Sequence, residues 1–341
     1  GSYQVGVWRA LTELGWRPDV ITGTSVGCLN GAMFATGQWA TARDMWLTID
    51  TRQVITDPPD PEQGVLNFWQ ETVRGGGLDV TPLESIVDRV LDEDALRTSP
   101  IEFGLVTVNK RNLRPLELTA QQIPQGQMKD YLLASAACFP AFRPRAIEGE
   151  QFIDGGYADE IPVNMAMQKG ATHVIAVNLK GMGLVKYDSI KKAPNLVYIE
   201  PKWDLGNILI FDRANAKRIM RLGYLDTMKA LGLLDGDSFA FAKGTFDKAT
   251  LKSADACARI FDLDPLVLYT REIFLEKISS SVQAAHAEAK EAFERYRSFS
   301  GLSGLPNPKE LLADFKAITG QHIPVFLIAY SLKEKGASSL F

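Results

Sequence analysis

The sequence has little cysteine: Cys28, Cys138 and Cys257 are the three in 341 residues. They are isolated from one another, so they form neither a CxxC metal site nor the even set that cross-links a small secreted domain. This scarcity favours a reducing compartment, and we expect a cytoplasmic protein. No charged and apolar leader precedes residue 1, but the chain opens abruptly, so the sequence leaves its native start and any targeting signal undecided.

Long apolar runs and an excess of positive charge are also missing. Runs such as FLIAY at 326–330 are far shorter than the roughly 18–20 residues that span a bilayer, so any membrane contact would be peripheral. The formal net charge is −4, which argues against a nucleic-acid partner. No Asp, Glu and His cluster has metal-ligand spacing. We expect no cofactor, and the sequence leaves the oligomeric state unknown.

The residues that are present indicate a folded α/β protein. Hydrophobic residues make up 46% and charged residues 23% of the chain, the profile of a globular protein with a sizeable core. Short β-branched runs alternate with helical patterns, and this alternation predicts a helix-flanked, mainly parallel sheet. The runs are DVIT (19–22), FGLVTVN (103–109), HVIAVNL (173–179) and LVYIE (196–200).

Helix signals suggest two parts, with a boundary near residue 250. The stretch 81–97 predicts one helix with Thr81 as N-cap, Pro82 at the first position and Glu84 completing a capping box. Beyond residue 250 the strand signals fade. We predict helices over 265–298, 308–319 and 323–335, so that residues 1–250 form an α/β body and 251–341 a helical part of unknown role.

The pentapeptide GTSVG at 23–27 is a candidate nucleophile elbow. A G-x-S-x-G pattern arises by chance in about one chain of this length in ten at average Gly and Ser usage. Here a predicted strand precedes it and a helical pattern follows, which is the setting that holds a nucleophilic serine on a strained turn. Gly23 and Gly27 have a steric reason, since side chains there would collide in so sharp a bend. Ser25 is therefore a candidate nucleophile, with a plain structural turn as the alternative.

A serine hydroxyl needs a base, and the three histidines are poorly suited to that role. His173 opens an apolar strand, His286 lies in a charged alanine-rich helix, and His322 precedes Pro324. A carboxylate acting directly on the serine is the other solution. Asp154 is the candidate, because it follows an apolar pair and precedes Gly155 and Gly156. Asp-Gly pairs also commonly make hairpin turns, which is the competing interpretation.

Taken together, these segments resemble a bacterial patatin-like phospholipase, a family of lipid acyl hydrolases that use a Ser–Asp dyad. The resemblance covers roughly residues 1–245. It rests on four segments in the expected order: GSYQVGVWRAL at the start, GTSVGCLNGA at the elbow, ASAACFPAFRP at 134–144 and FIDGGYADEIPV at 152–163.

The resemblance implies a three-layer α/β/α fold, a phospholipid or other acyl ester substrate, and roles for named residues. Ser25 would be the nucleophile and Asp154 the general base, with the backbone N–H of Val26 helping to hold the oxyanion. It implies a two-step reaction through an acyl-enzyme, whose hydrolysis by water activated by Asp154 releases a fatty acid. The family also uses a Gly-rich loop of the form GGGxxG, of which Gly1 could be the last glycine.

Two features depart from the family's pattern. The rest of the Gly-rich loop is not in the sequence, and loss of an oxyanion donor costs about 10²–10³ in turnover. We therefore expect either that this chain is a poor catalyst or that its native start has been omitted. Glu160 stands where the family usually has asparagine, so the geometry of the turn after the DGG segment at 154–156 is in question. RGGG at 74–77 is another glycine cluster, which could hold an oxyanion but is expected to be a flexible lead into the following helix.

Two further stretches bear on lipid contact. Apolar side chains concentrate in KWDLGNILIFDR (202–213), which could be ordinary core or part of a lipid groove. Arg213, Lys217 and Arg221 form a basic stripe, either a solvated face or a docking site for anionic head groups.

Two other functions remain open from the sequence. One is an acyltransferase or thioesterase acting on soluble acyl carriers, against which Thr24 counts mildly. The other is a non-catalytic lipid-binding protein built on the same fold.

Overall fold

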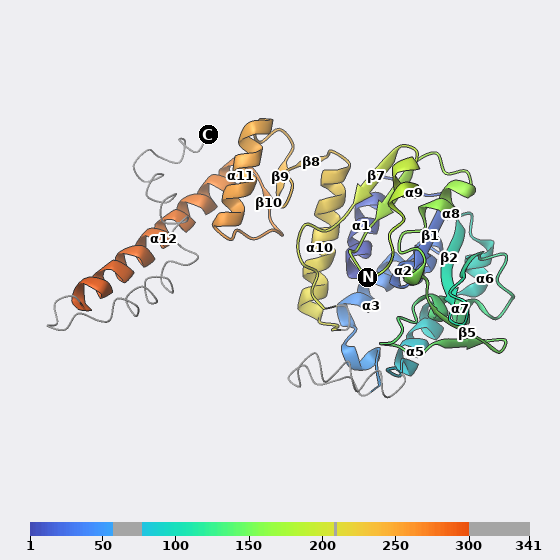
Figure 1. Ribbon diagram of the computed structural model, residues 1–341. Coiled ribbons are helices and arrows are strands. Elements are labelled where there is room, and N and C mark those ends of the chain that lie inside the picture. The colour runs from blue at the N-terminus through green and yellow to red at the C-terminus, as the bar shows by residue number, and fades with distance from the viewer. Residues whose placement is uncertain (57–76, 208–209, 300–341) are drawn as a thin grey trace. The chain divides into compact units, whose positions relative to one another are not determined.

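The computed structural model describes residues 1–56, 77–207 and 210–299 (Figure 1). The chain divides into two compact units, Gly1–Leu231 and a second that begins at Gly232. The boundary predicted near residue 250 falls within α11 (Lys248–Ile260) of the second unit. All of the candidate site residues therefore belong to the first unit.

The main sheet of the first unit has five strands in the order β1-β2-β5-β4, with β3 also paired to β2. The parallel pairing that the sequence predicted holds for β1 with β2, and for the separate pair β6 and β7. Strands β3 and β5 run antiparallel to β2, and β4 runs antiparallel to β5, so the sheet is mixed. The strands are β1 (Val20–Thr24), β2 (Glu102–Asn109), β3 (Pro115–Thr119), β4 (Arg145–Ile147), β5 (Glu150–Asp154), β6 (Val174–Val177) and β7 (Leu196–Ile199).

Helices cover both faces of this sheet. Phe103 and Leu105 of β2 pack in one apolar cluster with side chains of α2 (Val26–Ala35) and α7 (Met128–Ser135). On the opposite face Gly104 lies against the side chain of Met165 in α8 (Val163–Gln168). Because neighbouring residues of a strand point to opposite faces, α2 and α7 lie on one side and α8 on the other. The predicted three-layer α/β/α fold is confirmed.

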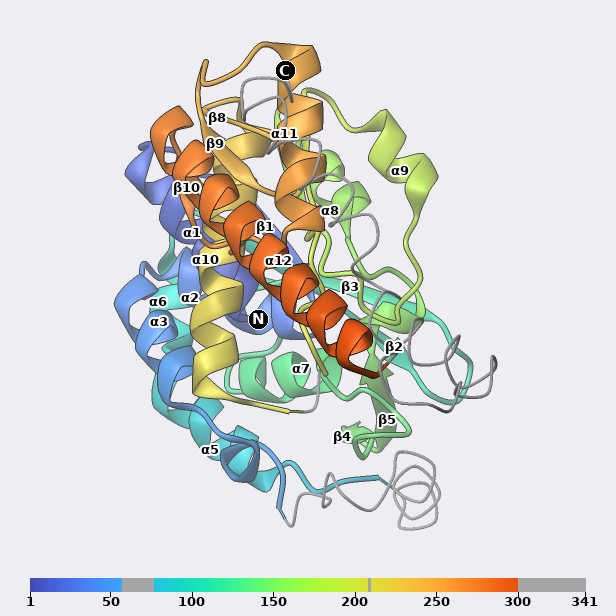
Figure 2. The same cartoon turned by 90° about the vertical axis from the view of Figure 1, so that its left-hand side faces the viewer.

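Two helices far apart in the sequence pack backbone to backbone. Helices α1 (Ser2–Glu13) and α10 (Arg213–Ala230) lie side by side (Figures 1 and 2). A Cβ on Gly6 would lie 1.9 Å from the carbonyl oxygen of Met220, and one on Gly223 would lie 2.1 Å from that of Tyr3. The Tyr3 hydroxyl also donates a buried 2.8 Å hydrogen bond to Asp226. Only glycine permits so close an approach at either contact.

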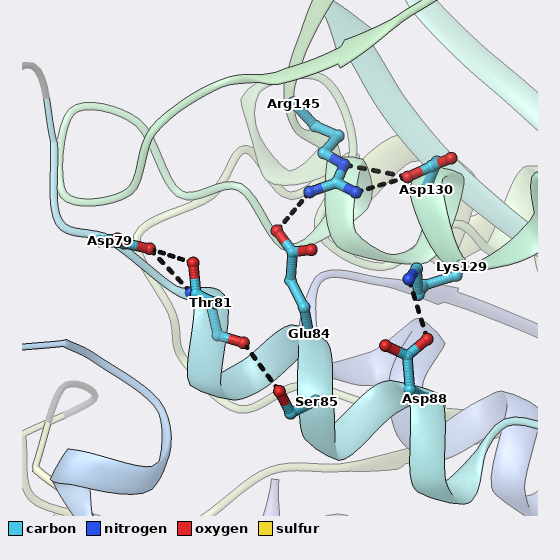
Figure 3. Close-up of polar contacts among 8 residues, drawn as sticks. All are labelled: Asp79, Thr81, Glu84, Ser85, Asp88, Lys129, Asp130 and Arg145. Carbon is cyan, nitrogen blue, oxygen red and sulfur yellow. Dashed lines mark hydrogen bonds and ion pairs between the residues drawn. The ribbon is translucent and has the colours of Figure 1, made fainter.

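The helix predicted over 81–97 is wrong in its length and its cap. The structure has two helices, α5 (Thr81–Val90) and α6 (Glu93–Thr98), because Asp92 caps the second by accepting from the Ala95 N–H at 2.9 Å. At the start of α5, Asp79 accepts from both the backbone and the hydroxyl of Thr81 (Figure 3). The N-cap residue is therefore Val80, which makes no side-chain capping bond, and Asp79 before it accepts from the first helical amide.

Glu84 has a different role from the predicted capping box. Its carboxylate pairs with the guanidinium of Arg145, which also binds Asp130 of α7 at 2.6 Å (Figure 3). Asp88 of α5 pairs with Lys129 at 2.9 Å. These contacts fasten α5 to α7 and β4.

The remaining elements of the first unit are α3 (Trp39–Thr48), η1 (Thr51–Gln53), η3 (Gly155–Tyr157) and α9 (Tyr187–Lys192).

The second unit contains short strands as well as helices, which the sequence did not predict. Its strands are β8 (Leu234–Asp235), β9 (Ala240–Ala242) and β10 (Leu268–Tyr269). Phe241 packs against Tyr269 and Phe274 in an aromatic core. The long helix predicted over 265–298 is α12 (Arg271–Phe299), which begins only after β10. The predictions of helices at 308–319 and 323–335 lie outside the described residues.

The contact between α1 and α10 predicts a stability effect. Gly223→Ala adds a Cβ that would overlap the Tyr3 carbonyl, so the helices must separate, at a cost of about 1–3 kcal/mol. We expect chemical denaturation to show this loss. Ala214→Leu, on the exposed face of α10, serves as the control and should change the unfolding free energy little. Equal unfolding free energies for Gly223→Ala and the parent would show that α1 and α10 do not pack this closely.

Candidate active site

Ser25 occupies a strained turn between β1 and α2. Its backbone has φ 57° and ψ −132°, a conformation that non-glycine residues rarely adopt. A Cβ on Gly23 would lie 2.5 Å from the backbone of Gly27, so the turn can be this tight only with glycine at position 23. At Gly27 the nearest atom to an added Cβ is the Gln4 amide at 3.3 Å, a milder restriction. The strand, turn and helix around Ser25 have the geometry of a nucleophile elbow.

The register of the sheet brings Asp154 to the same place. Strand β1 pairs with β2 as far as Thr24 opposite Val106, and β5 ends with Asp154 opposite Thr107. Strand β3 occupies the other edge of β2 over 104–108. Strands β1 and β5 therefore share one edge of β2 and meet end to end, with Ser25 directly after one and Asp154 at the end of the other.

The environment of Asp154 favours a carboxyl that can exchange a proton near neutral pH. Burial raises the pKa of Asp154 to about 6, while hydrogen bonds from the Ser25 hydroxyl and the Gly156 N–H act to lower it. The Gly156 N–H donates to Oδ1 at 2.8 Å. Glu160 adds a like charge nearby, which raises the pKa of Asp154 further. Burial is the largest of these effects because a buried carboxylate loses its hydration.

The glycines after Asp154 differ in how strictly they are required. A Cβ on Gly155 would lie 2.2 Å from the carbonyl oxygen of Val106 and 2.9 Å from the Thr24 side chain, so the turn is possible only without a side chain. A Cβ on Gly156 would approach Asp154 Oδ1 at 3.1 Å, a smaller conflict. Gly155 thus allows the two strand ends to come together.

Backbone donors for an oxyanion gather at the start of α2. Val26 is the first residue of this helix, and amides in the first turn have no acceptor within the helix. The Ser25 N–H is already used, since it donates to Ser135 Oγ at 3.0 Å, and Ser135 in turn donates to the Val106 carbonyl at 2.6 Å. Gly1 precedes α1, and its carbonyl accepts a 3.1 Å hydrogen bond from Asn30 of α2. The Val26 amide is thus the first of α2 and lies next to Ser25 along the chain.

Ser25 and Asp154 line one large cavity of about 1350 Å³. Apolar side chains of α3 and α5, including Met45, Leu83 and Val87, line part of it. Trp203, Leu205, Ile210 and Phe211 of the apolar stretch that the sequence analysis singled out line another part; Ile208 and Leu209 lie outside the described residues. An apolar cavity with a few convergent polar groups is typical of a site for an amphiphilic ligand.

The contacts of several residues around Ser25 and Asp154 were not predicted from the sequence. Ser135 positions the backbone of Ser25, and it lies in the ASAACFPAFRP segment, which was quoted without a role for this serine. Cys28 is fully buried beneath the elbow, and burial raises the pKa of its thiol to about 12. Glu160 accepts a 2.8 Å hydrogen bond from the Gly181 N–H. No short-range sequence signal indicates these contacts, since their partners are distant along the chain.

The other sequence candidates have different positions. His173 is exposed at the entry to β6, with its ring 3.2 Å from the Thr172 hydroxyl. The side chain of His286 and all of His322 lie outside the described residues, as do residues 74–76 of RGGG. Gly77, the last residue of that cluster, accepts a 3.2 Å hydrogen bond from Arg143. Within the described part of the chain, no group of His, Cys, Asp and Glu could hold a metal ion, and no helix could cross a membrane.

Comparison with known proteins gives the family. The family model for patatin-like phospholipase matches residues 1–167, which include the elbow and the Asp154 turn. Patatin-like phospholipase domain-containing protein 7 of Rattus norvegicus is 25% identical over 185 residues, covering 52% of this chain and 13% of the relative. Lysophospholipase nte1 of Aspergillus terreus is 26% identical over 198 residues, covering 52% of this chain and 11% of the relative.

A shorter relative matches as well. The uncharacterized protein YjjU of Escherichia coli is 24% identical over 214 residues, which cover 60% of this chain and 52% of that protein. The chain thus spans between about a tenth and a half of the length of these relatives. The family model and these relatives agree, and residues 1–167 match the domain of the patatin-like phospholipase family.

Proposed function

We propose that the protein hydrolyses acyl ester bonds of phospholipids or related lipids through a Ser25 acyl-enzyme, with Asp154 as the general base. One observation carries the proposal: the serine on the strained turn directly follows β1, which meets the end of β5 where the buried Asp154 lies, and burial raises the pKa of that carboxyl to about 6. A base with a pKa close to the working pH transfers protons most effectively. The match of residues 1–167 to the patatin-like phospholipase family model supports a lipid ester as substrate.

In the first step Ser25 Oγ attacks the ester carbonyl carbon as its proton passes to the Asp154 carboxylate. The carbonyl oxygen becomes an oxyanion, which the Val26 N–H at the start of α2 can stabilise. Because aligned peptide groups leave positive partial charge at a helix N-terminus, α2 adds to this stabilisation. When the intermediate collapses, the alcohol leaves with the proton that Asp154 had taken up, and Ser25 is acylated.

In the second step water replaces the alcohol. The Asp154 carboxylate removes a proton from water as its oxygen attacks the acyl carbon, and the new intermediate expels Ser25 Oγ. The proton returns to Ser25 and a fatty acid is released. The same carboxylate thus serves both half-reactions, which explains how the dyad can function without a histidine.

The cavity supports an amphiphilic substrate with a long acyl chain. A volume of about 1350 Å³ exceeds the range common for small ligands. Side chains of α3 and α5 offer an apolar path beside Ser25 for the acyl chain. The Aspergillus terreus relative is named a lysophospholipase, so a phospholipid with a single acyl chain is the first substrate to test.

Replacing the nucleophile should abolish catalysis. We expect Ser25→Ala to lower the rate of fatty-acid release from mixed phospholipid micelles by at least about 10³-fold. Ser85→Ala, an exposed serine of α5, is the matched control and should behave as the parent. Release that persists in Ser25→Ala would reject Ser25 as nucleophile, whereas binding of lipid without turnover in the parent would favour a non-catalytic lipid-binding protein.

The raised pKa of Asp154 predicts the pH dependence. Since the ionised carboxylate is the base, kcat/KM should be level above pH 7 and fall about tenfold per pH unit below pH of about 6. The measurement is a pH profile with a soluble short-chain ester. A profile with its acid limb near pH 4 would show that the base is an ordinary exposed carboxyl instead.

The same shift predicts that Asp154 destabilises the fold when it is ionised. Its folded pKa of about 6 lies above the ordinary 3.8, so the cost is absent below pH 3.8, grows as pH rises through this interval, and reaches about 3 kcal/mol above pH 6. Asp154→Asn should therefore be more stable than the parent at pH 7.5 and equal to it near pH 3.5. Exposed Asp19→Asn is the control. Equal stabilities at pH 7.5 would contradict this account.

A further inference from the structure

The exposed apolar side chains of the first unit are not scattered. Among its described residues, seven large apolar side chains are exposed, and four of these, Tyr157, Met182, Leu184 and Ile210, line the cavity that holds Ser25. Met182 is 73% and Leu184 62% exposed, so each points largely into solvent at the rim. Single exposed apolar residues are ordinary, but a group at the mouth of one cavity indicates an interaction surface.

The backbone of this rim is firmly fixed. Leu184 N–H donates to the Gly156 carbonyl at 2.7 Å, and Glu160 N–H donates to the Leu184 carbonyl at 2.8 Å. Glu160 Oε1 accepts from the Gly181 N–H at 2.8 Å, which ties the other end of the segment. Met182 and Leu184 are therefore held outward on a short segment that is bonded directly to the turn after Asp154.

The charged side chains that line the cavity carry no excess of positive charge. Lys180 and Lys202 line it, and so do Asp92, Asp154, Glu160, Asp204 and Asp212. Lys180 donates to the Pro201 carbonyl at 2.8 Å, and both lysines lie within 4 Å of Glu200. Such a rim matches the surface of a zwitterionic lipid layer, where the gain on contact comes from burying apolar side chains.

We propose that Tyr157, Met182, Leu184 and Ile210 form a docking rim that inserts into a zwitterionic lipid–water interface and holds the mouth of the Ser25 cavity against it. This inference rests on the proposed function for its substrate, since a lipid drawn from the interface would enter the cavity directly. It differs from docking through Arg213, Lys217 and Arg221, which would require anionic head groups. Arg221 lies over the Tyr224 ring at 5.4 Å, so its charge faces a neighbour on its own helix.

The first experiment measures binding without turnover. In the Ser25→Ala background, partitioning onto phosphatidylcholine vesicles is compared for the parent and for Met182→Ser/Leu184→Ser. We expect the double variant to bind about tenfold more weakly, because two apolar side chains no longer enter the interface. Leu113→Ser is the matched control, since Leu113 is 65% exposed in the turn between β2 and β3 and does not line the cavity. It should bind as the parent does.

The second experiment uses the active chain. The ratio of hydrolysis of micellar phospholipid to hydrolysis of a soluble short-chain ester should fall about tenfold in the double variant, with an unchanged melting temperature as proof of folding. Parent-like partitioning of the double variant would overturn the proposal. So would binding that requires anionic lipid and is lost when Arg213, Lys217 and Arg221 become Glu. Failure of the proposed function would appear separately. The chain with Ser25 intact would then hydrolyse neither substrate, although the double variant would still bind vesicles more weakly.

Discussion

The candidate site depends on two strands that share one edge of β2. Strand β1 runs parallel to β2 and stops opposite Val106, and β5 runs antiparallel to it and stops opposite Thr107. Two strands of opposite direction can meet end to end on one edge only if the junction has room for both. Gly155 supplies that room, because any side chain there would overlap the Val106 carbonyl. Ser25 and Asp154, 129 positions apart in the sequence, thereby become neighbours.

This arrangement is the basis of the proposal that a carboxylate acts on the serine directly. The chain enters α2 after Ser25 and leaves β5 at Asp154, so both backbones turn away from the sheet at the same point. The surrounding core excludes water, and this raises the pKa of Asp154 toward neutrality. The strain at Ser25 and the buried charge at Asp154 are local costs that the packed sheet around them can sustain.

Glu160 connects the dyad to the surface. In the sequence it is an anomaly in the turn after Asp154, but in the structure its carboxylate accepts from Gly181 and holds the segment that carries Met182 and Leu184. Its charge also acts on Asp154. A single side chain thus links the electrostatics of the candidate base to the apolar rim, which neither the elbow nor the DGG segment would indicate alone.

The sequence by itself determined the local features. The glycines around Ser25, the strand runs before it and at β2, and the α/β alternation follow from short-range sterics and side-chain periodicity. These features indicated the elbow and a helix-flanked sheet, and the resemblance to a known family implied the three-layer fold. The prediction of one helix over 81–97 was wrong, because Asp92 caps a second helix and Glu84 pairs with Arg145. Only tertiary structure decided the antiparallel course of β5, the approach of Asp154 to Ser25, and the partners of Ser135 and Glu160. Those contacts join residues tens to over a hundred positions apart, and their geometry depends on strand register and packing, which no local pattern encodes.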